Sequence, residues 1–179
     1  MILFITGGAR SGKSTAAVEA ARHSGRAVVF VATANAGDAE MAERIARHQN
    51  ERPDEWTTVE VPSALAEAIT DADPEACVVV DCLSLWVAHA LMADEMLSVE
   101  SLDLRLDAVV AAASGRPGPT IVVSNEVGSG IVPDNLLGRS FRDLLGRANQ
   151  RFAVAADRAV LSVSGRLVEL GTPSETLRV

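Results

Sequence analysis

The sequence predicts an α/β fold in which a mostly parallel sheet lies between two layers of helices, with an antiparallel hairpin at its C-terminal edge. Three observations support this prediction. Short apolar, β-branched runs alternate with longer helical patterns along the chain. The first four runs are apolar at nearly every position, as in strands whose two faces are both covered. The last two runs flank Ser164-Gly165, a turn sequence typical of a hairpin.

The expected elements follow one another in strand-helix order, which is the pattern of right-handed crossovers in a parallel sheet. Strands are expected at residues 2–6, 27–32, 78–81, 120–125, 159–163 and 167–170. Helices are expected at residues 14–23, 39–49, 83–91, 102–113 and 136–155. No internal repeat stands out, and 179 residues is the length of one ordinary domain. Residues 1–179 are therefore expected to form a single domain.

Composition and charge exclude several classes of partner. A net charge of −8 argues against a surface that follows nucleic acid or anionic lipid. Cys77 and Cys82 are too few for a disulfide scaffold, and a reducing compartment suits them. The apolar opening, residues 1–5, is too short for a membrane span and lacks the charged start of a signal peptide. We expect a cytoplasmic protein with no membrane span and no nucleic-acid partner.

A glycine-rich loop between the first strand and the first helix matches the phosphate-loop pattern G-x-x-x-x-G-K-[ST]. It consists of Gly7, Gly8, Ala9, Arg10, Ser11, Gly12, Lys13 and Ser14. In this pattern backbone N–H groups converge on phosphate oxygens, the lysine reaches the β- and γ-phosphates, and the Ser14 hydroxyl binds Mg²⁺. Lys13 is the only lysine in the chain. The loop predicts a RecA-like, three-layer P-loop NTPase sandwich, a nucleotide-binding catalytic domain.

Two further features lie where strands end. Asp81 closes an apolar strand, which is the arrangement of a Walker B carboxylate that binds Mg²⁺, although an aspartate before Leu83 also suits a helix N-cap. Residues 126–133 follow the strand at 120–125 at its carboxyl end, where open α/β sheets bind ligands. A ligand-binding loop and a plain connection both fit that position.

Of the three histidines, His48 has the most interesting surroundings. It shares one helical face with Met41 and Ile45, which suits a histidine at the edge of the core as well as a catalytic one. His23 ends the first helix, where a cation is favourable, and His89 lies in an apolar helix. Neither of these two is a candidate for chemistry.

Over nearly its whole length the chain resembles the bifunctional adenosylcobinamide kinase and adenosylcobinamide-phosphate guanylyltransferase family of cobalamin biosynthesis. The resemblance is carried by residues 7–14, 32–34, Asp38, Glu40, Met41, Arg44, Ile45, 48–53, Trp56, Thr58, Glu60, 81–86, 124–133, Asn135, Arg139, 141–143, Gly146, 149–150 and 156–157. So many ordered matches are far more specific than the phosphate loop alone.

The resemblance implies roles for particular residues. His48 matches the family's histidine that becomes guanylylated by GTP, with Lys13 as the second catalytic residue. The guanine nucleotide would be held by residues 7–14 together with Thr33, Ala34, Asn35, Gln49, Asn50, Glu51, Arg52, Glu60 and Asp81. Glu60 suits the guanine N1–H and 2-amino group. Some relatives have a second histidine before the nucleophile, where this chain has Arg47.

The implied enzyme uses ATP or GTP with Mg²⁺, phosphorylates adenosylcobinamide, and then transfers GMP to adenosylcobinamide phosphate, giving adenosylcobinamide-GDP. The resemblance also implies a homotrimer. One alternative is a kinase of another small molecule with no covalent guanylyl step. A second is a nucleotide-dependent switch, but the chain has no N-K-x-D sequence for reading guanine as switch GTPases do.

Overall fold

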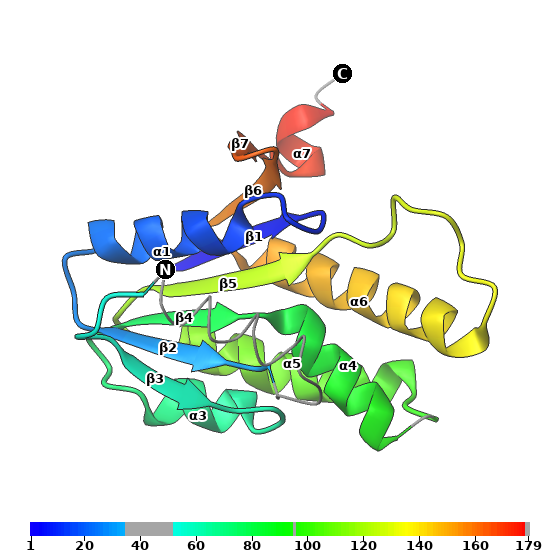
Figure 1. The fold of residues 1–179 in the computed structure, drawn as a ribbon, viewed down its shortest axis with the longest axis horizontal. Helices are drawn as coiled ribbons and strands as arrows, with labels where there is room; N and C mark the ends of the chain where they lie inside the picture. Colours follow the sequence, from blue (N-terminus) through cyan, green and yellow to red (C-terminus); the bar gives the residue numbers. More distant parts are fainter. Residues whose placement is uncertain (35–51, 95, 178–179) are drawn as a thin grey trace.

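The fold is a seven-stranded sheet with helices on both faces (Figure 1). A computed structural model of the chain describes residues 1–34, 52–94 and 96–177. The strands are β1 (Ile2–Gly7), β2 (Val28–Ala32), β3 (Thr57–Glu60), β4 (Cys77–Asp81), β5 (Thr120–Asn125), β6 (Arg158–Val163) and β7 (Arg166–Glu169). The helices are α1 (Lys13–His23), α3 (Leu65–Asp71), α4 (Leu83–Ala93), α5 (Val99–Ser114), α6 (Leu136–Ala155) and α7 (Pro173–Thr176).

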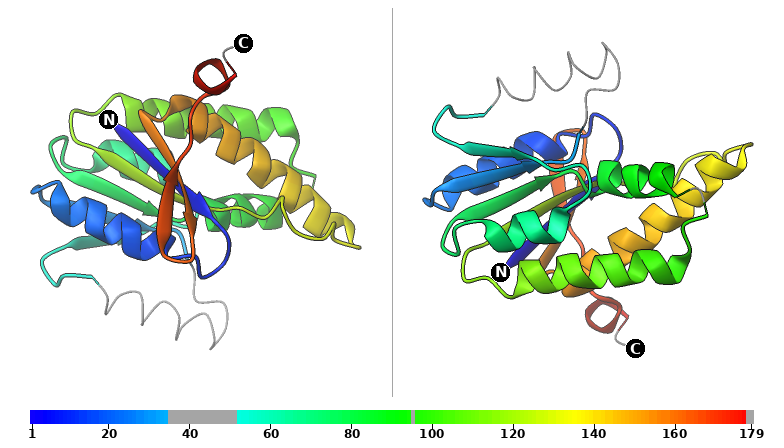
Figure 2. Two further views of the ribbon diagram at one scale, coloured as in Figure 1. Left: turned by 90° about the horizontal axis from the view of Figure 1, so that it is seen from above. Right: turned by 90° about the horizontal axis from the view of Figure 1, so that it is seen from below.

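The strand order is β3-β2-β4-β5-β1-β6-β7, and only the last pair is antiparallel. The predicted α/β architecture, with its parallel sheet and its C-terminal edge hairpin, is therefore confirmed. In Figure 2, α1 covers one face of the sheet, and α3, α5 and α6 cover the other. The connection from β1 to β2 runs through α1, and the connection from β5 to β6 crosses β1 through α6. The chain thus switches faces at the carboxyl end of β1, where such sheets bind ligands.

Two apolar clusters, one on each face of the sheet, hold these layers together. The larger cluster joins the strands to α3, α4, α5 and α6 through Phe4, Val80, Val122, Leu106 and Phe152. The smaller cluster joins them to α1 through Ala17, Ala21, Phe30, Val79 and Ile121. Because small alanines on α1 face the sheet, this helix can lie close to β1, β4 and β5. The start of α1 is thereby fixed against the end of β1.

The structure adds elements that the pattern did not predict. Strand β3 has four exposed residues and no buried alternation, so its pairing with β2, rather than its own sequence, makes it a strand. Helix α3 buries only Leu65 and Ile69, too short a stripe for the periodicity to be noticed. Helix α5 begins at Val99 rather than at 102, because the Ser98 side chain accepts a hydrogen bond from the N–H of Ser101. The helix expected at 39–49 lies outside the described residues.

Within the part of the chain that the structure describes, no helix is long and apolar enough to cross a membrane.

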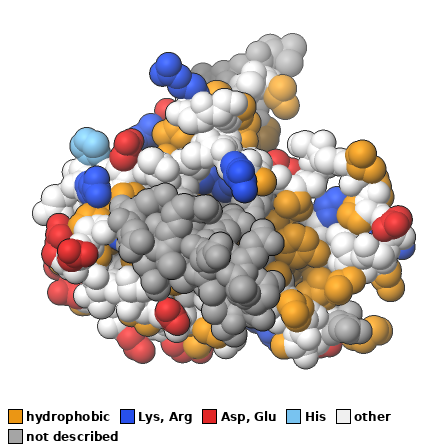
Figure 3. Space-filling view, in the orientation of Figure 1, with side chains coloured by type: hydrophobic (Ala, Val, Ile, Leu, Met, Phe, Trp, Pro, Cys, Tyr) orange, Lys and Arg blue, Asp and Glu red, His pale blue; other side chains and the backbone are white. Residues whose placement is uncertain are grey.

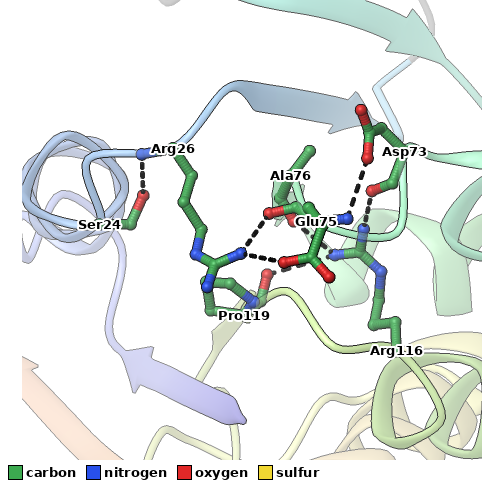
Figure 4. A network of polar contacts seen from close by, with 7 residues as sticks. All are labelled: Ser24, Arg26, Asp73, Glu75, Ala76, Arg116 and Pro119. Atoms are coloured by element: carbon green, nitrogen blue, oxygen red, sulfur yellow. Dashed lines mark hydrogen bonds and ion pairs between the residues drawn. The ribbon is translucent and has the colours of Figure 1, made fainter.

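At the amino ends of β4 and β5, opposite the phosphate loop, Arg116 joins the turn before β4 to the turn before β5 (Figure 4). Its guanidinium donates to the carbonyl oxygens of Ala76, Pro119 and Asp73 at 2.9, 3.3 and 2.5 Å. Beside it, Arg26 makes an exposed ion pair with Glu75 at 2.8 Å. Burial lowers the pKa of Arg116, but a guanidinium remains charged at any ordinary pH. Arg116 is thus a structural cation.

Replacing Arg116 with Ala removes the three hydrogen bonds that its guanidinium donates to these carbonyl oxygens and should lower the free energy of unfolding by about 2–4 kcal/mol. Arg26→Ala is the matched control: it removes an exposed pair and should cost less than about 1 kcal/mol. Urea unfolding followed by circular dichroism measures both values. Equal losses in the two variants would show that the buried contacts of Arg116 are not what matters.

Candidate active site

The phosphate loop lies between β1 and α1, as the sequence predicts. Some of its residues have positive φ angles, which favour glycine. Gly12 has φ 95° and Arg10 has φ 55°, both in the left-handed region. A Cβ at Gly7 would collide with the carbonyl oxygen of Ser162 on the neighbouring strand. Glycines are therefore required at both ends of the loop for distinct reasons, one for backbone angle and one for space.

The start of α1 is built to meet an anion. Gly12 is the N-cap, and in this helix, which the structure describes in full, no side chain caps the first N–H groups and no acidic residue lies in the first turn. Those N–H groups and the positive end of the helix dipole face the loop instead. Lys13 is only 7% exposed, and its Nζ donates to the Gly8 carbonyl oxygen at 2.6 Å. The one lysine of the chain thus lies within the loop.

The carboxyl ends of β3, β2 and β4 bring two predicted site residues, Glu60 and Asp81, into one row. The register pairs Ala32 with Glu60 on one side and with Asp81 on the other. Asp81 is half-buried at the end of β4, and Glu60 is exposed at the end of the edge strand. Strand β5 lies between β4 and β1, so Asp81 stands two strands from the phosphate loop. At about 4.8 Å per strand the separation of β4 from β1 is about 10 Å.

Thr33 continues from β2 and is fully buried, with its hydroxyl group engaged by the backbone of β4 and α4. The Thr33 Oγ1 donates to the Cys82 carbonyl oxygen at 2.7 Å and accepts from the Cys82 N–H at 2.8 Å. Its own N–H donates to the Asp81 carbonyl oxygen at 3.2 Å. Thr33 therefore fixes the backbone on both sides of Asp81's peptide link to Cys82. Ala34, half-buried, follows it.

Arg52 has its guanidinium over the ring of Phe30 on β2, at 3.5 Å from the ring centroid. Phe30 also stacks with Trp56, with ring centroids 6.5 Å apart. This stack lies on the face of the sheet that α1 covers. Cation–π contact positions the arginine on that face. The remaining predicted residues, Asn35, His48, Gln49, Asn50 and Glu51, and also Arg47, lie outside the described residues.

A chain of hydrogen-bonded polar residues, among those that carry the family resemblance but not among the predicted site residues, runs beside Asp81. Asn125, at the end of β5, donates from Nδ2 to the Ser84 hydroxyl at 3.0 Å, and Ser84 Oγ lies 2.9 Å from Cys82 Sγ. Asn149 on α6 donates to the Asn125 carbonyl oxygen at 2.9 Å. Their position could have indicated them, because Asn125 ends a buried strand and Cys82 and Ser84 follow another. This chain ties α4, α6 and β5 together next to the site.

Cys82 is not a candidate nucleophile, although it adjoins Asp81. Burial, followed by the neighbouring Asp81 carboxylate, raises the pKa of its thiol to about 11. The thiol therefore stays protonated at neutral pH, and only a thiolate is an effective nucleophile.

Residues 126–133 form the loop after β5, and their first residue is attached to the phosphate loop. The Glu126 N–H donates to the Gly7 carbonyl oxygen at 2.9 Å. The Glu126 Oε1 accepts from the N–H groups of Gly128 and Ser129 at 2.6 and 3.2 Å, which folds the loop on itself. The segment thus begins at the site, as its position after the strand predicts.

The fold and the loop together define the class: a P-loop NTPase of the RecA-like kind. Two solved structures share the fold. The RadB recombinase matches with a TM-score of 0.51 and 16% identity over 89% of this chain and 73% of that one. A prototypical ATPase from the type III secretion system of pathogenic bacteria matches with a TM-score of 0.51 and 13% identity, over 89% of this chain and 51% of that one. At these identities the likeness concerns the fold alone.

Sequence comparison gives the family. A family model described as cobinamide kinase / cobinamide phosphate guanyltransferase matches residues 3–170. The bifunctional adenosylcobalamin biosynthesis protein CobP of Pseudomonas aeruginosa is 43% identical over 162 residues, 90% of this chain and 92% of that protein. The corresponding CobU proteins of Salmonella typhimurium and Escherichia coli are 40% and 38% identical over 176 residues, 92% of this chain and 97% of each relative. The chain belongs to this family, which confirms the resemblance, and is a bifunctional kinase and guanylyltransferase.

Proposed function

We propose that this enzyme carries out both reactions of its family at one nucleotide site, with residues 7–14 holding the phosphates and His48 carrying the guanylyl group between substrates. The observation that supports it most is the phosphate loop itself, with its unblocked helix start and its single buried lysine. The substrates would be adenosylcobinamide and then adenosylcobinamide phosphate.

In the kinase step, the hydroxyl oxygen of adenosylcobinamide attacks the γ-phosphorus of ATP or GTP, and the bond from that phosphorus to the β-phosphate oxygen breaks. The nucleoside diphosphate leaves, and the hydroxyl proton is released. Such transfers depend on positioning and on neutralising charge rather than on covalent chemistry. The loop N–H groups and the start of α1 would bind the phosphates. Lys13 would exchange its contact with the Gly8 carbonyl oxygen for the β- and γ-phosphates.

Ser14 and Asp81 are the residues that would hold Mg²⁺. A hydroxyl and a carboxylate are hard oxygen ligands of the kind that Mg²⁺ prefers, so the donor set fits. Mg²⁺ is usually bound by one or two protein side chains, with phosphate oxygens and water completing its coordination. When bound, the ion would neutralise charge on the phosphates and link them to β4.

In the guanylyl step, a neutral imidazole nitrogen of His48 attacks the α-phosphorus of GTP, the bond to the bridging oxygen breaks, and pyrophosphate leaves. The phosphate of adenosylcobinamide phosphate then attacks the same phosphorus, the P–N bond breaks, and His48 is free again. The covalent intermediate splits one difficult transfer into two easier ones. His48 matches the guanylylated histidine of the family.

Incubation with Mg²⁺ and GTP labelled at the α-phosphate should leave acid-labile, base-stable label on the wild-type protein, because a phosphoramidate behaves in this way. His48→Ala should carry no label. His23→Ala, which removes an exposed histidine bonded to the Glu19 carbonyl oxygen, should label like the wild type. Label that survives in His48→Ala would refute the assignment, and absence of label in a wild type that binds GTP would favour a kinase without the covalent step.

Glu60 is proposed to read the guanine base. Strand β3 lies four strands from β1, which is about 19 Å at the usual spacing, so Glu60 suits the base end of a nucleotide rather than its phosphates. Its exposed carboxylate can accept hydrogen bonds from both the guanine N1–H and the 2-amino group.

Glu60→Gln should reduce the preference for GTP over ATP about tenfold, because the amide replaces one of the two acceptor oxygens with a donor. Titration calorimetry with each nucleotide measures the preference. Glu67→Gln, at an exposed position on α3, is the matched control and should leave it unchanged. An unaltered preference in Glu60→Gln would reject this role.

The homotrimer of the family is proposed for this chain, and an exposed apolar surface supports self-association. Hydrophobic side chains gather over α4 and the segment before α6 (Figure 3). The exposed apolar residues of this region are Met92 on α4, Met96 after it, Ile131 and Val132 before α6, and Leu136 and Leu137 in the first turn of α6. Contiguous apolar surface of this kind usually marks an interface.

The Leu136→Asp variant should be more monomeric than the wild-type trimer in sedimentation equilibrium, because burying an unpaired charge in an apolar interface costs free energy. Leu104→Asp changes an equally exposed leucine on α5 and should leave the trimer intact. A wild type that is monomeric at every concentration, or a Leu136→Asp variant that remains trimeric, would contradict this assembly.

A further inference from the structure

The hairpin formed by β6 and β7 packs directly on the phosphate loop, although some 150 residues separate the two in sequence. The carbonyl oxygen of Ser11 accepts two hydrogen bonds from the hairpin. One comes from the Ser162 hydroxyl at 2.8 Å and the other from the Gly165 N–H at 2.9 Å. Figure 2 shows the turn of the orange hairpin beside the blue loop that follows β1. A carbonyl oxygen has two lone pairs, so this one is fully occupied.

Burial and close packing make this contact rigid. Ser162 pairs with Gly7 in the β1–β6 ladder and is only 1% exposed. A Cβ at Gly7 would strike the Ser162 carbonyl oxygen, and a Cβ at Gly12 would lie 3.2 Å from the Gly165 Cα. The hairpin therefore touches both ends of the loop, and the two glycines of the motif leave room for it.

The hairpin turn has a defined geometry that places the Gly165 N–H against the phosphate loop. Ser164 has φ 49° and Gly165 has φ 76°, and two successive positive φ angles are the mark of a type I′ turn between strands. Its twist matches that of the paired strands, so the turn is held in register by the ladder. The Gly165 N–H is thereby held in position to donate to the Ser11 carbonyl oxygen.

The orientation of the Ser11–Gly12 peptide has a direct consequence for anion binding. In a trans peptide the C=O and N–H bonds point in opposite directions. Because the Ser11 carbonyl oxygen is held on the hairpin side, the Gly12 N–H points away from the hairpin. A carbonyl turned the other way would present a negative dipole to phosphate in place of a donor.

We propose that the β6–β7 hairpin is a working part of the phosphate site, in which Ser162 is a positioning residue that holds the Ser11–Gly12 peptide so that its N–H faces the β- and γ-phosphates. The inference rests on the proposed function, in which residues 7–14 bind these phosphates. Ser162 does not itself contact the nucleotide; it acts through the loop backbone. It therefore affects nucleotides that carry a β-phosphate more than those that do not.

The test is the affinity of Ser162→Ala for GTP and for GMP, measured by titration calorimetry at a temperature where thermal melting shows the variant folded. The GTP affinity should fall about fivefold, the value of one hydrogen bond, while the GMP affinity stays within twofold of the wild type. Ser162→Thr retains the hydroxyl group and should restore GTP binding. If Ser162→Ala does not fold, Ser162→Cys, a weak donor of similar size, replaces it with the same expected loss.

The matched control is Ser124→Ala. Ser124 is also a fully buried serine on a strand beside β1, but its hydroxyl donates to Asn149 at 2.6 Å rather than to the loop. The Ser124→Ala variant should have a lower melting temperature but keep the wild-type preference for GTP over GMP. An unchanged preference in Ser162→Ala, alongside a lower melting temperature, would show that Ser162 is merely structural.

Lys13→Ala separates this inference from the function on which it rests. Weaker GTP binding in Lys13→Ala together with unchanged binding in Ser162→Ala would overturn the hairpin's role alone. Undiminished GTP binding in Lys13→Ala would overturn the phosphate loop as the binding site, and the hairpin's role with it.

Discussion

The conformation of the loop between β1 and α1 is the constraint on which the rest of the site depends. Under the proposed function its backbone presents N–H groups to phosphate, and its carbonyl groups must then be held elsewhere. Gly7 O accepts from the Glu126 N–H, and Ser11 O accepts from the hairpin. β1 supplies one end of the loop and α1, packed through Ala17 and Ala21, supplies the other. The sheet order, with β5 on one side of β1 and β6 on the other, provides both anchors.

We propose that both reactions of the family take place at the same sheet edge. In this proposal the phosphates lie at the end of β1 and the start of α1. Asp81 lies at the end of β4, and Glu60 lies at the end of the edge strand β3. A nucleotide laid along this edge would meet a donor set at one end and a carboxylate at the other. The buried bonds of Thr33 to Cys82 keep the middle of the row in place.

Much of this fold could be predicted because its central strands are apolar on both faces and its phosphate loop has a specific spacing. The edge strand β3 could not, since Thr57, Thr58, Val59 and Glu60 are all exposed and pair only because β2 has a free edge. The loop residues and Asp81 were predicted and lie at the carboxyl edge of the sheet. Ser162 was not predicted, because one serine in an apolar strand carries no local signal and its proposed role depends on the β1–β6 register.

The central claim is that a single phosphate loop serves both the kinase and the guanylyltransferase reactions. The most direct measurement is the rate of each half-reaction in Lys13→Ala, assayed separately: adenosylcobinamide with ATP or GTP, and adenosylcobinamide phosphate with GTP. The account predicts that both rates fall together by at least about a hundredfold, because each uses Lys13 on the nucleotide phosphates. Loss of phosphorylation with guanylyl transfer at the wild-type rate would contradict it and require a second nucleotide site.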